Sequence, residues 1–357
     1  MHIGIIGLPA AGKTTVFQAL TSTDSPGMRA GGKGDTRIVP VPDVRLHTLA
    51  AMYHPRTVTP ATIEFVDPLV TGQQGAHFAD SLVSLMRDAD ALAHVVRAFQ
   101  NPAVPHPHGS VDAVRDFHAL NNELLLADLA VVEKRLERLT KDLKKVKNPE
   151  LESEYALLQR CQEALEAEHP LRSLPLTELE RKRLRGFGLL TSKAQLVVLN
   201  LDEAHIDPED PQVEQFRVQI RSPGLEVMPL YGKIESEIAQ LPPEEAHVFL
   251  QELGLPRSGL MRFIRESYTL LGLCSFFTAG EKEVRAWTIP SGTLAQQAAG
   301  VIHSDLERGF IRAEVVPYDD LVASGSVAKA REAGKLRIEG KEYQVQDGDV
   351  LLIRFNV

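Results

Sequence analysis

Short, mainly apolar runs alternate with longer polar and mixed stretches along the amino-terminal part of the chain. The runs lie at residues 2–6, 63–66, 91–96 and 194–199. Each run is typical of a buried strand, and the spacing of apolar residues from Thr15 to Leu20 is typical of the first turns of an amphipathic helix. Strands that alternate with helices predict an α/β fold. Residues 26–36 are rich in glycine and lack apolar periodicity, so we predict a mobile loop there.

A heptad pattern of apolar residues interrupts this alternation. Leucine and valine recur at alternating steps of four and three, at Leu125, Leu129, Val132, Leu136, Leu139, Leu143 and Val146. The pattern stops at Lys147-Asn148-Pro149 and a second helical stretch follows, which predicts an antiparallel helical hairpin. Because strand texture returns at residue 194, the hairpin is an insertion within the α/β domain. A plain structural arm and a partner-binding arm are both open interpretations.

The last part of the chain is rich in strand and turn signals. After a helical stretch near residues 244–272, apolar and polar residues alternate in the segments VRAWTI, FIRAEVV and GKEYQVQDGDVLLIRFNV. We therefore predict a small α+β module over residues 273–357.

Composition and charge narrow the possible functions. Of the 357 residues, 43% are hydrophobic and 24% are charged, which is typical of a globular protein of two or three domains. The formal net charge of -9 argues against a protein that coats nucleic acid by bulk electrostatics. Cys161 and Cys274 form no disulfide framework, and no apolar run is long enough to span a membrane. We expect a cytoplasmic protein without membrane contact.

The phosphate-loop pattern G-x-x-x-x-G-K-[ST] occurs between the first predicted strand and the first predicted helix. It is formed by Gly7, Leu8, Pro9, Ala10, Ala11, Gly12, Lys13 and Thr14, and Thr15 follows directly. Glycines let backbone N–H groups wrap around phosphates, and the positive end of the helix adds to the field. Lys13 would reach the β and γ phosphates of a nucleotide, and Thr14 would ligate Mg²⁺ through its hydroxyl.

Two further strand ends carry residues suited to a nucleotide site. Asp67 ends one predicted strand, where an acid can hold Mg²⁺ through its water shell, and the alternative is an ordinary turn residue. Asn200, Leu201 and Glu203 follow another predicted strand, in the position of base-reading residues. A short Asp in that position would read the N–H donors of guanine. Glu203 in its place weakens the prediction of guanine, and the alternative is a glutamate on a surface loop.

With these motifs, the chain resembles the YchF-type Obg-like ATPases, which belong to the translation-factor-related P-loop GTPases. The likeness spans the whole chain through the segments GLPAAGKTT, IVPVPDVRL, PATIEFVD, DALAHVVRAF, NNELLLADL, FTAGEKEVRAWT, IHSDLERGFIRAEVV and EGKEYQVQDGDVLLIRFNV. The resemblance implies an α/β P-loop NTPase domain (1–115 and 190–272), an inserted antiparallel α-helical coiled coil (116–189) and a carboxy-terminal α+β TGS-like domain (273–357).

The resemblance also implies ligands and partners. ATP is preferred over GTP through the motif from Asn200 to Glu203, and Mg²⁺ is the cofactor. Ribosomes are the expected partner, with contact to rRNA through the TGS-like and coiled-coil domains.

Further site residues follow from the resemblance alone. A loop histidine assists hydrolysis in the family, and the count along the loop places it at His106, whose neighbour His108 would complete a metal pair if further ligands were present. Leu69 takes the hydrophobic position of the second switch. Gly232 joins the nucleotide-binding residues, and Thr36 is the candidate Mg²⁺-sensing threonine of the first switch.

Three segments depart from the family pattern and keep the function open. Asp67-Pro-Leu-Val70 lacks the glycine whose N–H senses the γ-phosphate, Ala10 stands where the family has Asn, and the first switch is rich in glycine. One hypothesis is a slow Mg²⁺-dependent ATPase with His106, Lys13 and Leu69 as catalytic residues. The second is a nucleotide-gated binding module with little or no hydrolysis. A GTP-preferring GTPase is a further alternative, and a small-molecule kinase is disfavoured because no acceptor site is evident.

Overall fold

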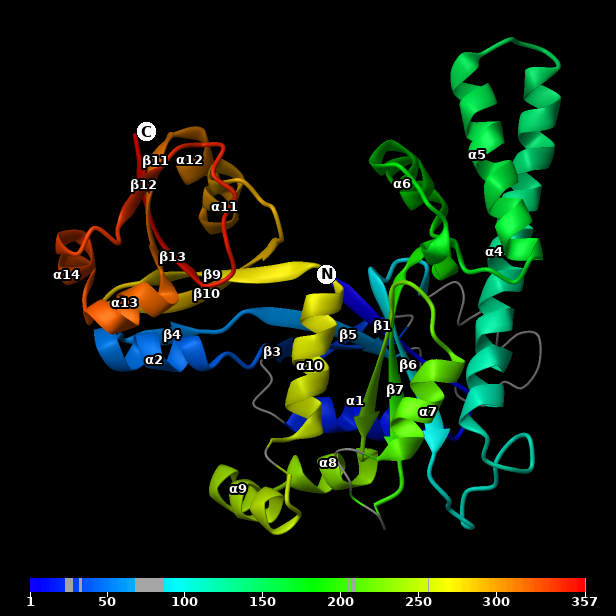
Figure 1. Ribbon diagram of the computed structural model, residues 1–357, viewed down its shortest axis with the longest axis horizontal. Helices are drawn as coiled ribbons and strands as arrows, with labels where there is room; N and C mark the ends of the chain where they lie inside the picture. Colours follow the sequence, from blue (N-terminus) through cyan, green and yellow to red (C-terminus); the bar gives the residue numbers. More distant parts are fainter. Residues whose placement is uncertain are drawn as a thin grey trace. The chain divides into compact units, whose positions relative to one another are not determined.

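The computed structural model of the chain describes residues 1–22, 28–31, 34–67, 86–203, 206, 210–255 and 257–356 (Figure 1). The chain divides into two compact units, one of Met1–Ile38 with Glu64–Phe263 and the other of Val39–Ile63 with Ile264–Val357. The sequence prediction placed residues 39–63 in the nucleotide domain, whereas in the structure they group with the carboxy-terminal residues. The reason is strand pairing, because β4 (Thr57–Thr59) pairs in parallel with β10 (Glu283–Pro290). The division into three domains stays a prediction.

The first unit is built on an α/β sheet. Within the described residues this sheet has seven strands in the order β2-β3-β5-β1-β6-β7-β8. The strands are β1 (His2–Ile6), β2 (Met28–Gly31), β3 (Gly34–Pro40), β5 (Thr62–Asp67), β6 (Ala91–Ala98), β7 (Ala194–Leu201) and β8 (Leu225–Leu230). β1 pairs in parallel with β5 and β6, and β7 and β8 extend the parallel sheet beyond β6. The predicted α/β fold and its four buried strands are confirmed.

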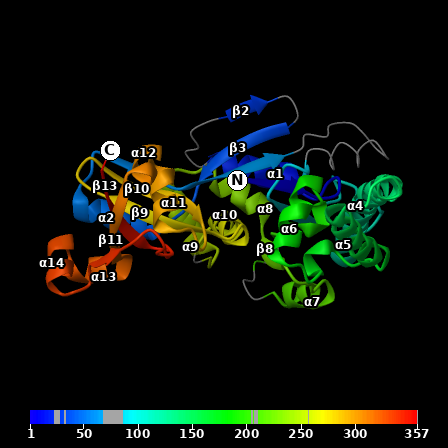
Figure 2. The same cartoon turned by 90° about the horizontal axis from the view of Figure 1, so that it is seen from above.

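The glycine-rich segment near residue 30 differs from the prediction. β2 and β3 form an antiparallel pair in which Arg29 lies opposite Thr36 (Figure 2). The prediction of a mobile loop was therefore wrong for residues 28–31 and 34–36, while residues 26, 27, 32 and 33 lie outside the described residues. A ladder of backbone hydrogen bonds needs no buried side chains, so such a pair leaves no apolar period in the sequence.

Helices lie between and after the strands of this sheet along the chain. In chain order they are α1 (Lys13–Ser22), α4 (Ala113–Leu143), α5 (Pro149–Glu166), α6 (Glu178–Leu184), α7 (Pro211–Gln219), α8 (Gly232–Ile238), α9 (Pro243–Glu252) and α10 (Gly259–Leu270), with short 3-10 turns at Leu171–Ser173, Arg185–Phe187 and Leu190–Ser192. The helices up to α7 lie between strands of this sheet along the chain, and α8, α9 and α10 follow its last strand, β8. In the described part of the chain, no helix is both long enough and apolar enough to cross a membrane.

Helix α4 contributes to more than one hydrophobic core. Near its start, Phe117 and Leu124 are buried in clusters with residues of the sheet strands. Further along, Val132 and Leu139 are buried against α5, which runs antiparallel to α4 (Figure 1). Asn148 caps α5 and the following proline occupies its first turn, which explains the abrupt start of the second helix. The helical hairpin between β6 and β7 matches the prediction, while its coiled-coil character stays a prediction.

The second unit has its own sheet and core. Among the described residues, the strand order of this sheet is β12-β11-β13-β9-β10-β4. Its remaining elements are β9 (Leu273–Ala279), β11 (Phe310–Pro317), β12 (Arg337–Glu339), β13 (Asp349–Phe355), α2 (Val44–Tyr53), α11 (Ala295–Ile302), α12 (Ser304–Arg308), α13 (Tyr318–Ser324) and α14 (Val327–Glu332). Phe276 and Ile289 are buried in its core with alanines of α11. Strands and helices thus mix in residues 273–356 as predicted, and the TGS-like nature of this region stays a prediction.

A buried carboxylate on α4 binds the 3-10 turn that precedes β7. The side chain of Asp128 on α4 is fully buried. It accepts hydrogen bonds from the backbone N–H groups of Leu190 (2.9 Å) and Thr191 (2.7 Å) and from the hydroxyl of Thr191 (2.7 Å). Burial raises the pKa of Asp128, and these hydrogen bonds oppose that rise. The carboxylate therefore fixes the point at which the chain returns to β7.

Replacement of Asp128 by alanine should destabilise the first unit. The substitution leaves two buried N–H groups without an acceptor, so we expect the free energy of unfolding to fall by about 3 kcal/mol in urea denaturation. Asp142→Ala, an exposed position near the end of the same helix, is the matched control and should change stability by less than about 0.5 kcal/mol. Equal stability of the two variants would show that Asp128 does not hold this junction.

Candidate nucleotide site

The phosphate loop lies between the end of β1 and the start of α1, and its glycines are required by close packing. A Cβ atom on Gly7 would lie 2.4 Å from the carbonyl oxygen of Val95, and one on Gly12 would lie 2.2 Å from Nδ2 of Asn200. Both distances are shorter than real carbon contacts, so no side chain fits at either position. The loop backbone can therefore approach its neighbours, and a bound phosphate, closely.

The side chain of Lys13 folds back into this loop. Its Nζ donates hydrogen bonds to the carbonyl oxygens of Gly7 (2.8 Å) and Leu8 (2.9 Å). Burial lowers the pKa of Lys13 to about 8, and the charge of Asp67 opposes this shift. The ammonium group is thus held where phosphate oxygens can replace the two carbonyl oxygens as its acceptors.

One carboxylate interacts with the lysine, and a second carboxylate on the neighbouring strand interacts with the first. Asp67 at the end of β5 is buried, and its burial raises its pKa, while Lys13 lowers that pKa and Asp35 on β3 raises it. Mg²⁺ prefers hard oxygen ligands such as carboxylates and hydroxyls. Asp67 and Thr14, which is exposed at the start of α1, are donors of this kind and fit the ion. Thr36 follows Asp35 on β3 and is half-buried.

Asn200 connects the phosphate loop to the start of α8. Its Nδ2 donates to the carbonyl oxygen of Ala11 (3.1 Å), and its Oδ1 accepts from the N–H of Gly232 (3.0 Å). The side chain is buried. Asn200 and Gly232, both predicted to bind the nucleotide, therefore lie together against the loop, and both ends of the Asn200 amide already hold backbone groups.

The other predicted residues at these strand ends lie in different surroundings. Leu201 is buried in the core beneath the site, so its side chain faces the protein interior. Glu203 lies nearer the surface and forms an ion pair with Lys233 on α8. Thr15 lies half-buried in the first turn of α1. Leu69, predicted as a catalytic residue, lies outside the described residues.

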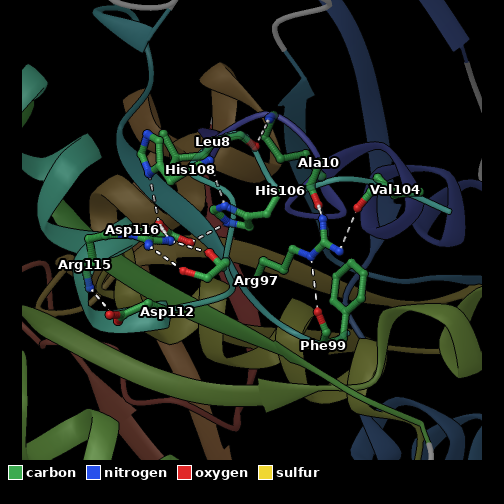
Figure 3. A network of polar contacts seen from close by, with 12 residues as sticks. Leu8, Ala10, Arg97, Phe99, Val104, His106, His108, Asp112, Arg115 and Asp116 are labelled. Atoms are coloured by element: carbon green, nitrogen blue, oxygen red, sulfur yellow. Dashed lines mark hydrogen bonds and ion pairs between the residues drawn. The ribbon is translucent and has the colours of Figure 1, made fainter. Parts of the chain in front are cut away.

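His106 lies under the start of the phosphate loop and is buried there (Figure 3). Its Nε2 is 2.7 Å from Oδ2 of Asp116, and each of the two side chains is only 4% exposed. Its Nδ1 accepts a hydrogen bond from the backbone N–H of His108 at 3.1 Å. A cavity of about 10 Å³, lined in part by Leu8, His106 and Asp116, is large enough for about one water molecule. In this arrangement both ring nitrogens of His106 have protein neighbours.

Arg97 is a member of the site that sequence analysis missed. It lies at the end of β6, is buried, and donates hydrogen bonds to backbone carbonyl oxygens of Phe99, Asn101 and Val104 and, at 3.5 Å, of Ala10 (Figure 3). It thereby joins the phosphate loop to the segment that leads to His106. The available signal was a charged residue in β6, a strand whose other residues are apolar except for His94.

Known proteins resemble the chain over its full length. It is 45% identical to the ribosome-binding ATPase YchF of Bacillus subtilis (strain 168), and the match covers 99% of both chains. The chain belongs to the YchF family. Its identity to the ribosome-binding ATPase YchF of Escherichia coli O157:H7 is 41%, again over 99% of both chains.

Two further comparisons agree with membership of the YchF family. The solved structure of the Schizosaccharomyces pombe YchF GTPase superposes with a TM-score of 0.89 at 32% sequence identity, covering 99% of this chain and 97% of that one. Residues 273–356 match the family model YchF-GTPase_C, which is described as "Protein of unknown function (DUF933)". The P-loop α/β fold and the resemblance inferred from sequence are confirmed.

Loss of the Asn200 amide should weaken the site and the fold together. Asn200→Ala leaves the carbonyl of Ala11 and the N–H of Gly232 without their partner, so we expect the free energy of unfolding to fall by about 2 to 3 kcal/mol. Glu203→Ala, three residues along, removes only an ion pair at the surface and should leave the free energy of unfolding within about 0.5 kcal/mol of wild type. Urea denaturation of both variants measures the difference. An Asn200→Ala variant as stable as Glu203→Ala would contradict the bridging role.

Proposed function

We propose that this member of the YchF family is a Mg²⁺-dependent P-loop ATPase that associates with ribosomes in the cytoplasm. The observation that carries the proposal is the ammonium group of Lys13 inside the phosphate loop, with the buried carboxylate of Asp67 near it. The names of the relatives in Bacillus subtilis and Escherichia coli, which are ribosome-binding ATPases, support the same activity.

The residues of the site would divide the work of binding. Lys13 exchanges the carbonyl oxygens of Gly7 and Leu8 for oxygens of the β and γ phosphates, and backbone N–H groups of the loop donate to the same phosphates. Thr14 and Asp67 would hold Mg²⁺, which supplies charge neutralisation for phosphoryl transfer. Asn200 holds the phosphate loop beside Gly232 by hydrogen bonds to both. We propose that Glu203 contributes to the choice of adenine over guanine.

Hydrolysis would use a different position of His106 from the one in the structure. With Nδ1 accepting from His108 and Nε2 beside Asp116, the ring cannot also orient a water molecule at the γ-phosphate. The proposed role of His106 therefore requires the segment around it to move. This requirement is consistent with slow turnover in the absence of a partner.

Contact with ribosomes would involve the helical hairpin. Exposed basic residues lie along the last turns of α4 and the turn that follows, with exposed Glu137 and Asp142 among them, at Lys134, Arg138, Lys141, Lys144, Lys145 and Lys147. Such a group of positive charges favours binding to phosphates of RNA. We propose that the hairpin, and the TGS-like carboxy-terminal region implied by the family, contact rRNA.

The first test is steady-state phosphate release from ATP and from GTP with Mg²⁺, in the presence and absence of ribosomes. We expect turnover of ATP that ribosomes accelerate, loss of nucleotide binding in Lys13→Ala, and a fall in kcat of about a hundredfold or more in His106→Ala. His118→Ala on the exposed surface of α4 is the matched control and should behave as wild type. Tight ATP binding without any phosphate release would instead favour the nucleotide-gated binding module.

The choice of base can be tested at Glu203. Glu203→Asp shortens the side chain to the length that reads guanine, so we expect the ratio of ATP to GTP affinity to fall by about tenfold, the value of one net hydrogen bond. Competition of ATP and GTP against a labelled ATP analogue measures this ratio. Lys233→Ala removes the partner of Glu203 and controls for a general effect of the ion pair. An unchanged ratio in Glu203→Asp would exclude Glu203 from base reading.

A further inference from the structure

The segment that carries His106 is attached to the first turn of α4 at three alternate residues. His106 Nε2 and His108 Nδ1 lie 2.7 Å and 3.4 Å from the carboxylate of Asp116. The third attachment is made by Arg115, which donates to the backbone carbonyl oxygen of Ser110 at 2.6 Å and to its hydroxyl at 3.1 Å. Residues 106–110 are therefore held on α4 by side-chain contacts along their whole length.

Asp116 is itself fixed in place. Both Nε and Nη2 of Arg115 donate to its Oδ1, at 3.0 Å and 2.9 Å. Its Oδ2 is buried and makes no well-aligned hydrogen bond within the described residues, although Nε2 of His106 lies close to it. The carboxylate is thus a buried anion oriented by an arginine, and its second oxygen is directed at the imidazole of His106.

The same groups do not make a favourable cation site. One ligand atom from each of His106, His108 and Asp116 lies within 4.8 Å of the others. However, the guanidinium of Arg115 already neutralises Asp116, and Nδ1 of His106 accepts the N–H of His108. A metal ion would have to compete with Arg115 for the carboxylate and break the hydrogen bond between His108 and His106. The geometry therefore favours a contact that holds the histidine over a site that binds an ion.

We propose that Asp116 is a positioning residue that holds His106 in a resting position, away from the nucleotide, until residues 106–110 detach from α4. This inference rests on the proposed role of His106 in hydrolysis. It explains why a histidine expected to act on water is 4% exposed and has protein atoms at both ring nitrogens. Turnover then depends on the fraction of molecules in which this contact is open.

Asp116→Asn is the informative substitution because it keeps the shape of the side chain and removes the charge. We expect kcat for ATP without ribosomes to rise about tenfold with an unchanged KM, because Asp116 does not contact the phosphate loop by a hydrogen bond and its loss opens the resting contact. The double variant with His106→Ala should lose this gain. Stimulation by ribosomes should be smaller in Asp116→Asn than in wild type, because part of the opening has already occurred.

Asp112→Asn is the matched control. Asp112 caps the same helix through the N–H of Arg115 and is exposed, and asparagine caps a helix as well as aspartate does. This variant removes one negative charge from the same helix end without touching His106. It should keep the kcat and KM of wild type.

A second measurement follows the position of His106 without using its activity. Modification by diethyl pyrocarbonate, followed residue by residue with mass spectrometry, should be slow at His106 in wild type and faster in Asp116→Asn. The exposed His118 serves as the internal reference and should react equally in both proteins.

The outcomes separate this inference from the proposed function. If wild type shows turnover that depends on His106 but Asp116→Asn does not raise it, or if His106 is modified as fast as His118 in wild type, the resting contact is refuted and the ATPase stands. If neither wild type nor Asp116→Asn shows turnover that depends on His106, the catalytic role of His106 falls, and the inference falls with it.

Discussion

The nucleotide site depends on how the backbone groups at the ends of the parallel strands are satisfied. Strands β1, β6, β7 and β8 end at the same edge of the sheet, and the loops that leave them come close together. Asn200 donates to the phosphate loop and accepts from the first residue of α8, and Arg97 donates to the phosphate loop and to the segment that follows β6. Without these two side chains, buried polar backbone groups would face each other without partners. The shape of the phosphate loop therefore depends on side chains from the neighbouring strands β6 and β7 as well as on its own sequence.

Partly buried charges of opposite sign lie together at this edge of the sheet. Burial lowers the pKa of Lys13 and raises the pKa of Asp67. The charge of each residue shifts the pKa of the other back toward its ordinary value. Asp35 adds a second negative charge near Asp67, and in the described residues the acceptors of Arg97 are backbone carbonyl oxygens. Nucleotide phosphates would compensate the buried cations, and Mg²⁺ would compensate the carboxylates. In the proposed function, the two ligands would therefore compensate opposite charges of the same site.

The sequence predicted the features that depend on local pattern. Apolar runs marked β1, β5, β6 and β7, and Asn148 with the following proline marked the turn of the hairpin, because burial and capping leave a signature within a few residues. It could not reveal β4 pairing with β10, or the bond from Asn200 to Ala11 across 189 positions, because contacts between distant segments have no spacing to detect. The β2–β3 pair was missed for a different reason, since its backbone ladder leaves no apolar period. Among the site residues, Lys13 was found by its motif, whereas Asp116 had no motif and became visible only when the fold placed it against His106.

Helix α4 is the element through which the site and the hairpin are physically continuous. It has 31 residues, which corresponds to about 45 Å at 1.5 Å per residue. Asp116 lies in its first turn beside His106, Asp128 in its middle is bonded to the 3-10 turn that precedes β7, and its last turns pair with α5. Phe117 and Leu124 pack against strands of the sheet, and Asp128 holds the turn before β7, so the first half of α4 is fixed to the first unit while its last turns contact α5. A displacement of the hairpin would therefore have to act through this fixed part of α4 to reach the contact at Asp116, so the junction at Asp128 bears on the site as well as on the stability of the fold.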